Sequence, residues 1–442
     1  MPGGSTTERG SIGAWLSRPW GAACLIGSVA QLLFSIGLTT PHKPVFDETH
    51  YVPAARALLA LSHPVNIEHP LVGKELIALG MLIFGDNSLG WRLFASVAGT
   101  ATVLGLFAIL MLLTGRMRVA VIGAVLALLN FSLFIQARIA MLDVFEAAFL
   151  TSAIAAFLWS MTAPPEKVLR RWVLAAALLG LAMGAKWAAV PFLAYAIAAI
   201  LFVRWREARR AGRPPVALFD MAEGPYWPGL PAASALPWLL AVSVGVYLAT
   251  FLPAFFYADQ PLTFASLLSF QGRMYAEQTQ VLAPHPYQSS WWSWPLDIRP
   301  IWYLYEASDG GAWRGVLMIG NPAIWWGGLV CVGVALWRWG MGGPAKALLP
   351  VALWAGAFLP FALIPKSLGF IHYYFPASVF LCGVIATELS GRRSRRKGFW
   401  RADTLFVTVS ALLFLYFYPI ISASALPDSQ AFHQWMWLPT WP

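Results

Sequence analysis

The stretch that decides the fold is an apolar run, WGAACLIGSVAQLLFSIGL at 20–38, followed by VFDETHY at 45–51. The run approaches the ~20 apolar residues that a helix needs to cross a bilayer. The second segment places two adjacent carboxylates, Asp47 and Glu48, where the chain leaves the membrane. Because carboxylates beside a bilayer are costly to keep, they mark functional sites. The two segments predict a membrane-spanning helix that carries an acidic pair to one membrane surface.

The composition extends this prediction to the whole chain. Of its 442 residues, 59% are hydrophobic and 11% are charged, whereas soluble domains average ~25% charged residues. The mean hydropathy is +0.64, and the 23 Trp and 13 Tyr residues suit the aromatic belts at membrane surfaces. The three cysteines lie inside apolar runs, with neither a disulfide framework nor the spacing of a metal site. We therefore predict an integral membrane protein.

Ten further apolar runs follow the first, and together they predict an all-α polytopic bundle of about eleven transmembrane helices. The runs lie at 20–38, 91–113, 119–135, 143–161, 172–186, 188–203, 236–254, 317–337, 347–363, 372–389 and 403–420. Because the two runs between 172 and 203 follow each other almost without a loop, we expect their two helices to be short or tilted. We expect the first run to stay uncleaved, since a signal peptide has a shorter apolar core.

The basic residues predict the orientation of the bundle. With the amino terminus inside the cell, 20 of the 30 Lys and Arg residues fall on the inner side, as the positive-inside rule requires. They are Arg9, Arg18, Arg116, Arg118, Lys167, Arg170, Arg171, Arg204, Arg206, Arg209, Arg210, Arg213, Arg338, Lys346, Arg392, Arg393, Arg395, Arg396, Lys397 and Arg401. The net charge of +10 is therefore a topology signal, and we expect no nucleic-acid partner.

Two long segments, 39–90 and 257–316, fall on the outer side together with 13 of the 20 acidic residues. We therefore divide the chain into an amino-terminal transmembrane module at 1–256, an outer loop at 257–316 and a carboxy-terminal transmembrane module at 317–442. The inner segment 204–235 is predicted to be a linker. Because loops on a rigid scaffold carry function, we expect a multi-pass protein of the plasma (inner) membrane with its site on the outer, periplasmic face.

Two motifs of the first outer segment offer polar ligands. Asp47 and Glu48 could hold a cation, a hydroxyl group or a proton, or they could simply face water. In HPLVGK at 69–74, the proline and glycine could form a turn that holds His69 and Lys74 toward an anion. Alternatively, Lys74 could snorkel to the membrane surface.

Three charged residues lie at the outer ends of predicted spans. Arg92 opens the second span, and Arg138 and Asp143 lie in ARIAMLD at 137–143, where the third span meets the fourth. Arg138 and Asp143 are about one and a half helical turns apart, so they could bind a ligand or neutralise each other.

Further cations lie in two other outer turns. Lys186 precedes Trp187 between the two short spans, where it could either bind a ligand or snorkel. Lys366 and His372 lie in the turn PKSLGFIHYY at 365–374, where they could bind a phosphate at headgroup depth.

The second outer segment contains HPYQSSWWSWP at 285–295. Its aromatic rings, including Trp291 and Trp292, could anchor the membrane interface, or they could pack on the C–H faces of a sugar. His285 and Arg299 would then supply the polar groups that orient such a ligand.

In this order the motifs resemble those of the protein O-mannosyltransferases, a polyprenyl-phosphate-sugar-dependent family with the GT-C membrane fold. The shared motifs are DE, HPxxGK, RxxxLD, KW, HPYxSxWWxWP, GNP and HYY, and they run from 46 to 376. The chain departs from the family at Leu71-Val72, where Pro-Leu is usual, and at Ala188-Ala189, where Thr-Gly is common. The segment 257–316 is too short for the trefoil domain of eukaryotic members, which favours a bacterial-type member.

The resemblance implies an inverting glycosyltransferase that moves mannose from polyprenyl-phosphate mannose to Ser/Thr hydroxyls of exported proteins. Asp47 is the expected catalytic base, and Glu48 is expected to orient Asp47 or the acceptor. The expected ligands of the donor phosphate and lipid are Arg92, Arg138, Lys366 and His372. The expected ligands of the sugar and acceptor are His69, Lys74, Asp143, His285, Trp291, Trp292 and Arg299.

The same scheme requires no cofactor, although Asp47 and Glu48 could loosely hold Mg²⁺ or Mn²⁺. The expected partners are the lipid-linked donor, the acceptor protein, the bilayer and the protein-export machinery. One alternative is a GT-C transferase that acts on lipid A or a cell-wall glycan. A transporter is the other alternative, but the charges collect on one face and no repeated halves are visible.

Overall fold

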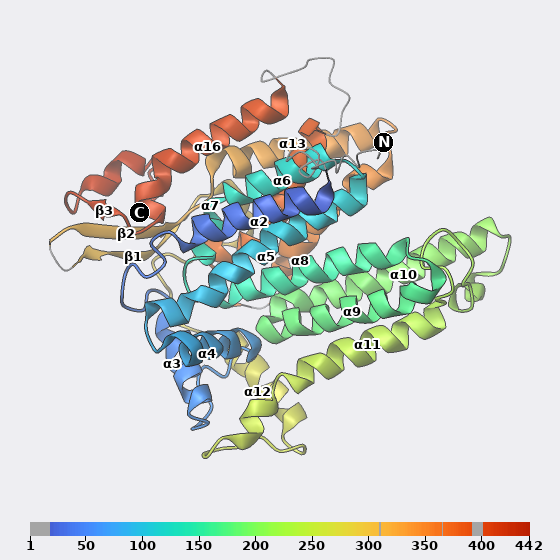
Figure 1. Cartoon of the computed structure of the whole chain (residues 1–442), viewed down its shortest axis with the longest axis horizontal. Helices are drawn as coiled ribbons and strands as arrows, with labels where there is room; N and C mark the ends of the chain where they lie inside the picture. Colours follow the sequence, from blue (N-terminus) through green and yellow to red (C-terminus); the bar gives the residue numbers. More distant parts are fainter. Residues whose placement is uncertain (1–17, 309–310, 365, 391–400) are drawn as a thin grey trace, which may run out of the picture.

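The computed structural model describes residues 18–308, 311–364, 366–390 and 401–442. Most of its helices run between two ends of the molecule (Figure 1). One end, here called the sheet end, carries a small β-sheet, and the opposite end carries the segment 211–231. Of the basic residues used to predict the orientation, Arg9 and those at 392–397 lie outside the described residues.

Each of the eleven predicted runs contains an α-helix over most of its length. These are α2 (Pro19–Ser35), α5 (Ser88–Thr114), α6 (Met117–Leu128), α8 (Leu142–Met161), α9 (Pro165–Ala185), α10 (Val190–Arg210), α11 (Ala232–Ala249), α13 (Pro322–Gly340), α14 (Leu349–Phe358), α15 (Phe375–Ser390) and α16 (Ala402–Ile421). Eight helical stretches among the described residues are long and apolar enough to cross a membrane, whereas α2 and α6 are apolar but shorter. The polytopic helical fold is confirmed, and the count of eleven spans stays a prediction.

The third predicted run, 119–135, does not form one helix. It divides at Asn130 into α6 and the short helix α7 (Phe131–Gln136). The fully buried Asn130 amide donates to Ser378 Oγ at 2.8 Å, and its oxygen accepts from Ser132 Oγ at 3.0 Å. Because asparagine competes with backbone hydrogen bonds in a helix, it supplies the break that hydropathy does not indicate.

The structure revises two expectations about the middle of the chain. Helices α9 and α10 have 21 residues each, so they are not short, and the alternative that they are tilted stays a prediction; they meet at the tight turn that contains Lys186. The segment after α10 is also more ordered than a linker. Arg204 is fully buried and donates to the backbone carbonyl of Leu230 at 2.7 Å, which folds the segment back onto α10.

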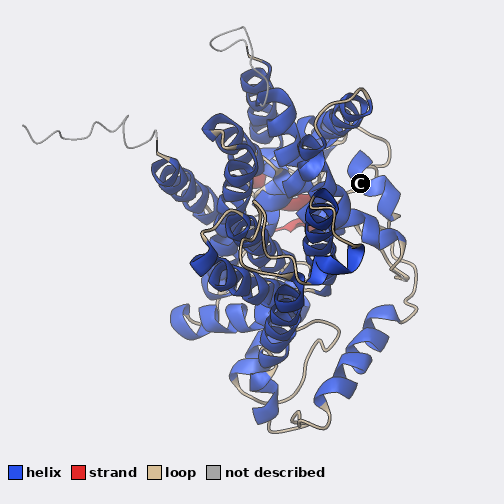
Figure 2. Cartoon of the chain, turned by 90° about the vertical axis from the view of Figure 1, so that its right-hand side faces the viewer, coloured by secondary structure: helices blue, strands red, loops and turns tan. Residues whose placement is uncertain are grey.

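The sheet was not predicted. Strands β1 (Ile301–Ala307) and β2 (Trp313–Met318) pair antiparallel, and β3 (Ala425–Leu426) pairs with β2, in the order β1-β2-β3. The start of the predicted span at 317 is therefore strand, and α13 begins only at Pro322, after Asn321 has capped it through the Ala323 N–H. Figure 2, viewed from the opposite end, shows the strands between the helices.

Three more helices lie at the sheet end. The first outer segment forms α3 (Glu48–Leu59) and α4 (Val72–Phe84), and the second forms α12 (Leu267–Thr279). Helix α4 packs backbone to backbone on α5, since a Cβ on Gly80 would lie 2.1 Å from the carbonyl oxygen of Gly90. This close packing fixes the first outer segment against the bundle.

Candidate active site

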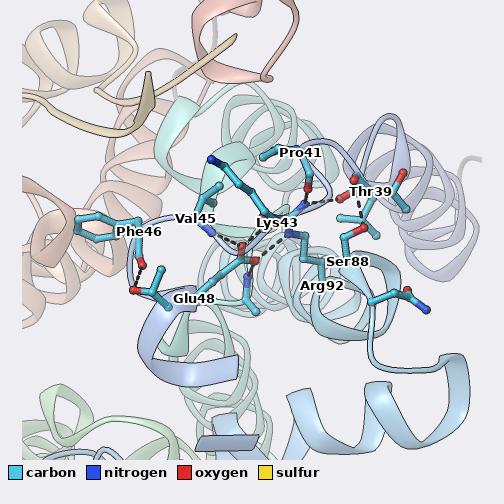
Figure 3. Close-up of polar contacts among 12 residues, drawn as sticks. Thr39, Pro41, Lys43, Val45, Phe46, Glu48, Ser88 and Arg92 are labelled. Atoms are coloured by element: carbon cyan, nitrogen blue, oxygen red, sulfur yellow. Dashed lines mark hydrogen bonds and ion pairs between the residues drawn. The ribbon is translucent and has the colours of Figure 1, made fainter. Parts of the chain in front are cut away.

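Glu48 and Arg92 form a buried ion pair at the start of α3 (Figure 3). Both side chains are fully buried. Arg92 Nε donates to Glu48 Oε1 at 2.8 Å, and Nη2 donates to Oε2 at 2.7 Å. The other Arg92 N–H groups donate to the backbone carbonyls of Leu38, Pro41 and Lys43.

This geometry does not fit the phosphate role assigned to Arg92, and for Glu48 it favours the expected role of orienting Asp47 over that of orienting the acceptor. A guanidinium has five N–H donors, and the five bonds of Arg92 stay inside the protein, so none is left for a lipid phosphate. Glu48 also accepts from the backbone N–H groups of Val45, at 2.9 Å, and Ala140, at 2.7 Å. Both of its oxygens are therefore occupied, and Glu48 positions the chain beside Asp47 instead of contacting a substrate.

Asp47 lies next to this pair and is half-buried. Its Oδ2 accepts from the Tyr51 hydroxyl at 3.3 Å, one turn along α3. Burial is the main cause that raises the pKa of Asp47 to about 6, while Lys186 lowers this pKa and Asp143 raises it. Asp47 is thus a stronger base than an exposed aspartate and is still ionised at neutral pH.

Asp143 and Lys186 form a second buried ion pair, between α8 and the turn after α9. Lys186 Nζ lies 2.7 Å from Asp143 Oδ1. Asp143 Oδ2 has no hydrogen-bond partner among the described residues, nor has Oε2 of Glu146, one turn along α8. Asp143 is therefore paired with Lys186 and not with Arg138, and one of its oxygens remains free for a ligand.

Lys366 brings a second ammonium group to the same place. Its Nζ donates to the Tyr373 hydroxyl at 2.8 Å and lies 4.4 Å from the centre of the Tyr373 ring. Lys186 Nζ lies 4.9 Å from the centre of the same ring. Burial, together with Lys186, lowers the pKa of Lys366 to about 8, while Asp143 and Asp47 raise it.

Two histidines complete the cluster. The His372 ring lies 4.5 Å from the Tyr373 ring and 5.6 Å from that of Phe46, the residue before Asp47. The His69 ring packs edge-on to Tyr51 at 5.9 Å. Burial lowers the pKa of His69 well below its usual value, so this imidazole is neutral. The Nδ1 atoms of both histidines lack partners among the described residues.

Two other predicted ligands donate hydrogen bonds to backbone carbonyls. Lys74 is buried, and its Nζ donates to the carbonyls of Val65, Asn66 and His69, so it closes the loop before α4. Arg138 donates to the carbonyls of Ile36, at 2.7 Å, and Ser422, at 3.3 Å. The assignment of Lys74 to an acceptor does not fit its contacts, because three carbonyls take up its three N–H donors. Arg138 differs, since its buried Nε has no hydrogen-bond partner among the described residues, and its assignment to the phosphate stays a prediction.

The second outer segment approaches the cluster only in part. The His285 ring packs edge-on to Phe370 at 5.3 Å, and Phe370 stacks on His372. Arg299 donates to the carbonyls of Pro286 and Thr440, and its expected role toward the sugar stays a prediction. The other two predicted ligands are separate from the cluster: Trp291 packs near Phe358, and Trp292 is 59% exposed.

The structure adds residues that the motifs did not single out as ligands. Lys186 was left between two roles, Tyr51 only flanked a motif, and Tyr373 lies inside the HYY motif but was given no role. Tyr303 of β1 stacks on Phe46 with 3.9 Å between ring centres, and the buried Gln136 amide donates to its hydroxyl at 3.5 Å. Tyr303 comes from a strand that hydropathy did not indicate, so no local pattern could have identified it.

Solved structures share this arrangement of helices. The structure titled as the Saccharomyces cerevisiae protein O-mannosyltransferase Pmt1-Pmt2 complex bound to the sugar donor matches with a TM-score of 0.80 at 14% identity, covering 98% of this chain and 94% of that one. ArnT from Cupriavidus metallidurans matches with a TM-score of 0.57 at 14% identity, covering 91% and 77%. The fold is that of the GT-C membrane glycosyltransferases.

Sequence comparisons narrow this class to one family. A model described as dolichyl-phosphate-mannose-protein mannosyltransferase matches 80–258, and one described as the C-terminal four TMM region of protein-O-mannosyltransferase matches 263–441. Proteins named polyprenol-phosphate-mannose–protein mannosyltransferase match at 25% identity in Corynebacterium glutamicum (96% of this chain, 93% of that protein) and at 26% in Mycobacterium tuberculosis (95% and 91%). The chain belongs to the protein O-mannosyltransferase family.

The Glu48–Arg92 pair predicts that Arg92→Lys destabilises the fold. Lysine has three donors and no planar fork, so several buried acceptors would lose their partners. Breaking a buried pair costs about 3 kcal/mol or more, which a thermal melt in detergent would detect. Arg56→Lys is the matched control, because Arg56 pairs with Asp86 on an exposed surface, where an ion pair contributes less than about 1 kcal/mol. If the melting temperature of Arg92→Lys is unchanged while mannosyl transfer is lost, the structural role is wrong and Arg92 would instead be assigned to binding the donor phosphate.

Proposed function

We propose that this chain transfers mannose from polyprenyl-phosphate mannose to Ser/Thr hydroxyls of exported proteins, with inversion at the anomeric carbon. The names of the bacterial relatives support this donor and a protein acceptor. The observation that carries the proposal is the half-buried Asp47, which lies beside two ammonium groups at one end of a membrane-spanning bundle.

Asp47 acts as the general base. The acceptor oxygen attacks the anomeric carbon, its proton passes to the Asp47 carboxylate, and the bond between the anomeric carbon and the phosphate oxygen breaks. The electron pair of that bond leaves with the polyprenyl phosphate, so no general acid is required. A pKa of about 6 suits this role, because a base is most effective when its pKa lies near the working pH.

Lys186 and Lys366 stabilise the departing phosphate. Both ammonium groups lie within 5 Å of the centre of the Tyr373 ring, and we propose that they bind the same anion. Asp143 holds Lys186 in place, while the half-buried Lys366 can exchange its bond to the Tyr373 hydroxyl for one to phosphate. Preorganised positive charge of this kind is a main source of rate enhancement in group transfer.

The two ammonium groups supply the positive charge that a divalent cation provides in other transferases, and we propose that the reaction needs no metal. Asp47 and Glu48 do not converge as a metal-binding pair, since both oxygens of Glu48 accept hydrogen bonds from protein groups. Among the described residues, no three His, Cys, Asp or Glu side chains gather in a way that could hold a metal ion.

The sheet end faces the outer side of the plasma membrane in this proposal. The basic residues at the opposite end, including Arg206, Arg209 and Arg210, then lie in the cytoplasm. An acceptor would reach the site in an extended form as it leaves the export machinery, and the polyprenyl tail of the donor would lie along the spans.

Asp47→Asn should lower transfer by about 10² to 10⁴-fold, the usual contribution of a general base. Amide and carboxylate have the same size, and the donor is held elsewhere, so donor binding should change little. Initial rates with purified protein, donor and a Ser/Thr peptide measure the effect. Asp86→Asn is the matched control, because Asp86 is an exposed carboxylate at the same end.

The wild-type kcat/KM should also fall as the pH drops through about 6, because protonation removes the base. The remaining activity of the Asn variant should lack this acid limb. Near-normal turnover of Asp47→Asn would contradict the base assignment, and Asp143 would become the next carboxylate to test.

Lys366→Gln should weaken transition-state stabilisation by roughly 10 to 100-fold in kcat/KM, since hydrogen bonds to charged groups contribute about 1.5–3 kcal/mol. Lys346→Gln, an exposed lysine at the opposite end, should leave the rate unchanged. Equal rates for both variants would remove Lys366 from the phosphate site.

Cysteine labelling tests the orientation. In a background with Cys24→Ser, a membrane-impermeant reagent added to intact cells should label His285→Cys and not Arg206→Cys, because His285 is exposed at the sheet end. The reverse pattern would overturn the proposed orientation and the location of the site with it.

A further inference from the structure

One face at the end of α10 combines aromatic rings with unpaired positive charge. Phe202, Trp205, Arg206, Arg209 and Arg210 line a concave surface there. Their spacing of three and four residues places all five on one side of the helix. This face lies at the opposite end of the bundle from Asp47, so the proposed reaction does not use it (Figure 1).

No carboxylate in the described part of the chain compensates the charge on this face. Arg206, Arg209 and Arg210 are exposed and form no ion pair with any described carboxylate. Glu207, the one acidic residue among them, is buried and turned toward Arg204, with which it forms an ion pair at 2.5 Å. The helix therefore turns Glu207 inward and Arg206, Arg209 and Arg210 outward.

The aromatic residues place these arginines at the depth of lipid headgroups. Phe202 is 55% exposed, and its ring lies 5.9 Å from that of Trp205. The Arg209 guanidinium lies over the Trp205 ring at 5.1 Å, which orients its plane while leaving its N–H edges free. Nearby, Val216 of the 3₁₀ turn Pro215–Phe219 is 67% exposed, as an element that dips into a bilayer would be.

We propose that this face is a binding site for the headgroup of an anionic glycerophospholipid. Phe202 and Trp205 contact the acyl and glycerol region, and the three arginines bind the phosphodiester. Basic pockets beside transmembrane helices recognise acidic headgroups in this way. The positive-inside rule alone accounts for the number of arginines but not for an arginine and aromatic face with its acid turned inward.

The full chain in nanodiscs of phosphatidylcholine, with or without phosphatidylglycerol, provides the test. Native mass spectrometry counts the phosphatidylglycerol molecules that stay bound to the protein after it is released from the nanodisc. Each arginine contributes about 1 kcal/mol near an anionic surface, so Arg206→Gln, Arg209→Gln and Arg210→Gln together should weaken retention by about 100-fold. Arg209→Lys alone should keep most of it, since the charge remains.

A control removes the same charge from the same end. Lys167→Gln, Arg170→Gln and Lys346→Gln together change three exposed residues that do not line this face, so retention should persist. If the control variant loses as much phosphatidylglycerol as the arginine variant, net charge alone explains the binding and the proposed site is wrong. Full retention of phosphatidylglycerol by the arginine variant would also overturn the proposal.

Two further results would indicate a different ligand for this face. Displacement of the lipid by inorganic phosphate would indicate a site for soluble anions, and tight binding of a polyglutamate peptide without lipid would indicate an acidic protein partner. Either result would overturn the lipid proposal. If the triple variant does not accumulate, Arg210→Gln alone should still weaken retention about fivefold, and no change would count against the site. None of these outcomes depends on mannosyl transfer.

Discussion

The buried bond network between Glu48 and Arg92 determines where Asp47 lies, because the two carboxylates are adjacent in the chain. Arg92 comes from α5, and its carbonyl partners come from the loop after α2. Glu48 also accepts from the N–H of Ala140, between α7 and α8. One ion pair thus ties three parts of the bundle together. Buried charges are costly unless they are fully bonded, and here both partners are, so the position of Asp47 is rigid.

The site itself contains partly compensated charges. Lys186 is neutralised by Asp143, whereas the one hydrogen bond of Lys366 within the described part of the chain is to a tyrosine hydroxyl. Asp47, Asp143 and Glu146 supply more carboxyl groups than the two lysines can pair, and Asp143 and Glu146 each keep an oxygen that has no partner in the described ranges. Unpaired polar atoms in a buried site cost stability, and they suit a place where a hydroxyl-rich sugar and an anionic phosphate bind together.

Hydropathy and the positive-inside pattern were sufficient to predict the helical bundle and to place the acidic pair at one end. They could not show the break at Asn130, which depends on a contact with Ser378 on a distant helix. They also could not show the sheet, since β1 and β2 resemble ordinary interfacial segments rich in aromatic residues.

For the site, the motifs identified Asp47, Asp143, Lys366, His69 and His372, which the structure brings together. The motifs also assigned ligand roles to Arg92 and Lys74, whose donors bind backbone carbonyls or a buried carboxylate. The residue type at a membrane surface does not reveal whether a cation faces a ligand or the backbone. That distinction requires three-dimensional contacts.

The stereochemistry of transfer tests the central claim most directly. Purified protein would be incubated with polyprenyl-phosphate mannose and a Ser/Thr-containing peptide, and the anomeric configuration of the product would be determined by NMR. The account predicts mannose on a Ser or Thr hydroxyl with the configuration opposite to that of the donor, as a single displacement with Asp47 as base requires. Retained configuration, or no sugar on the peptide, would contradict it.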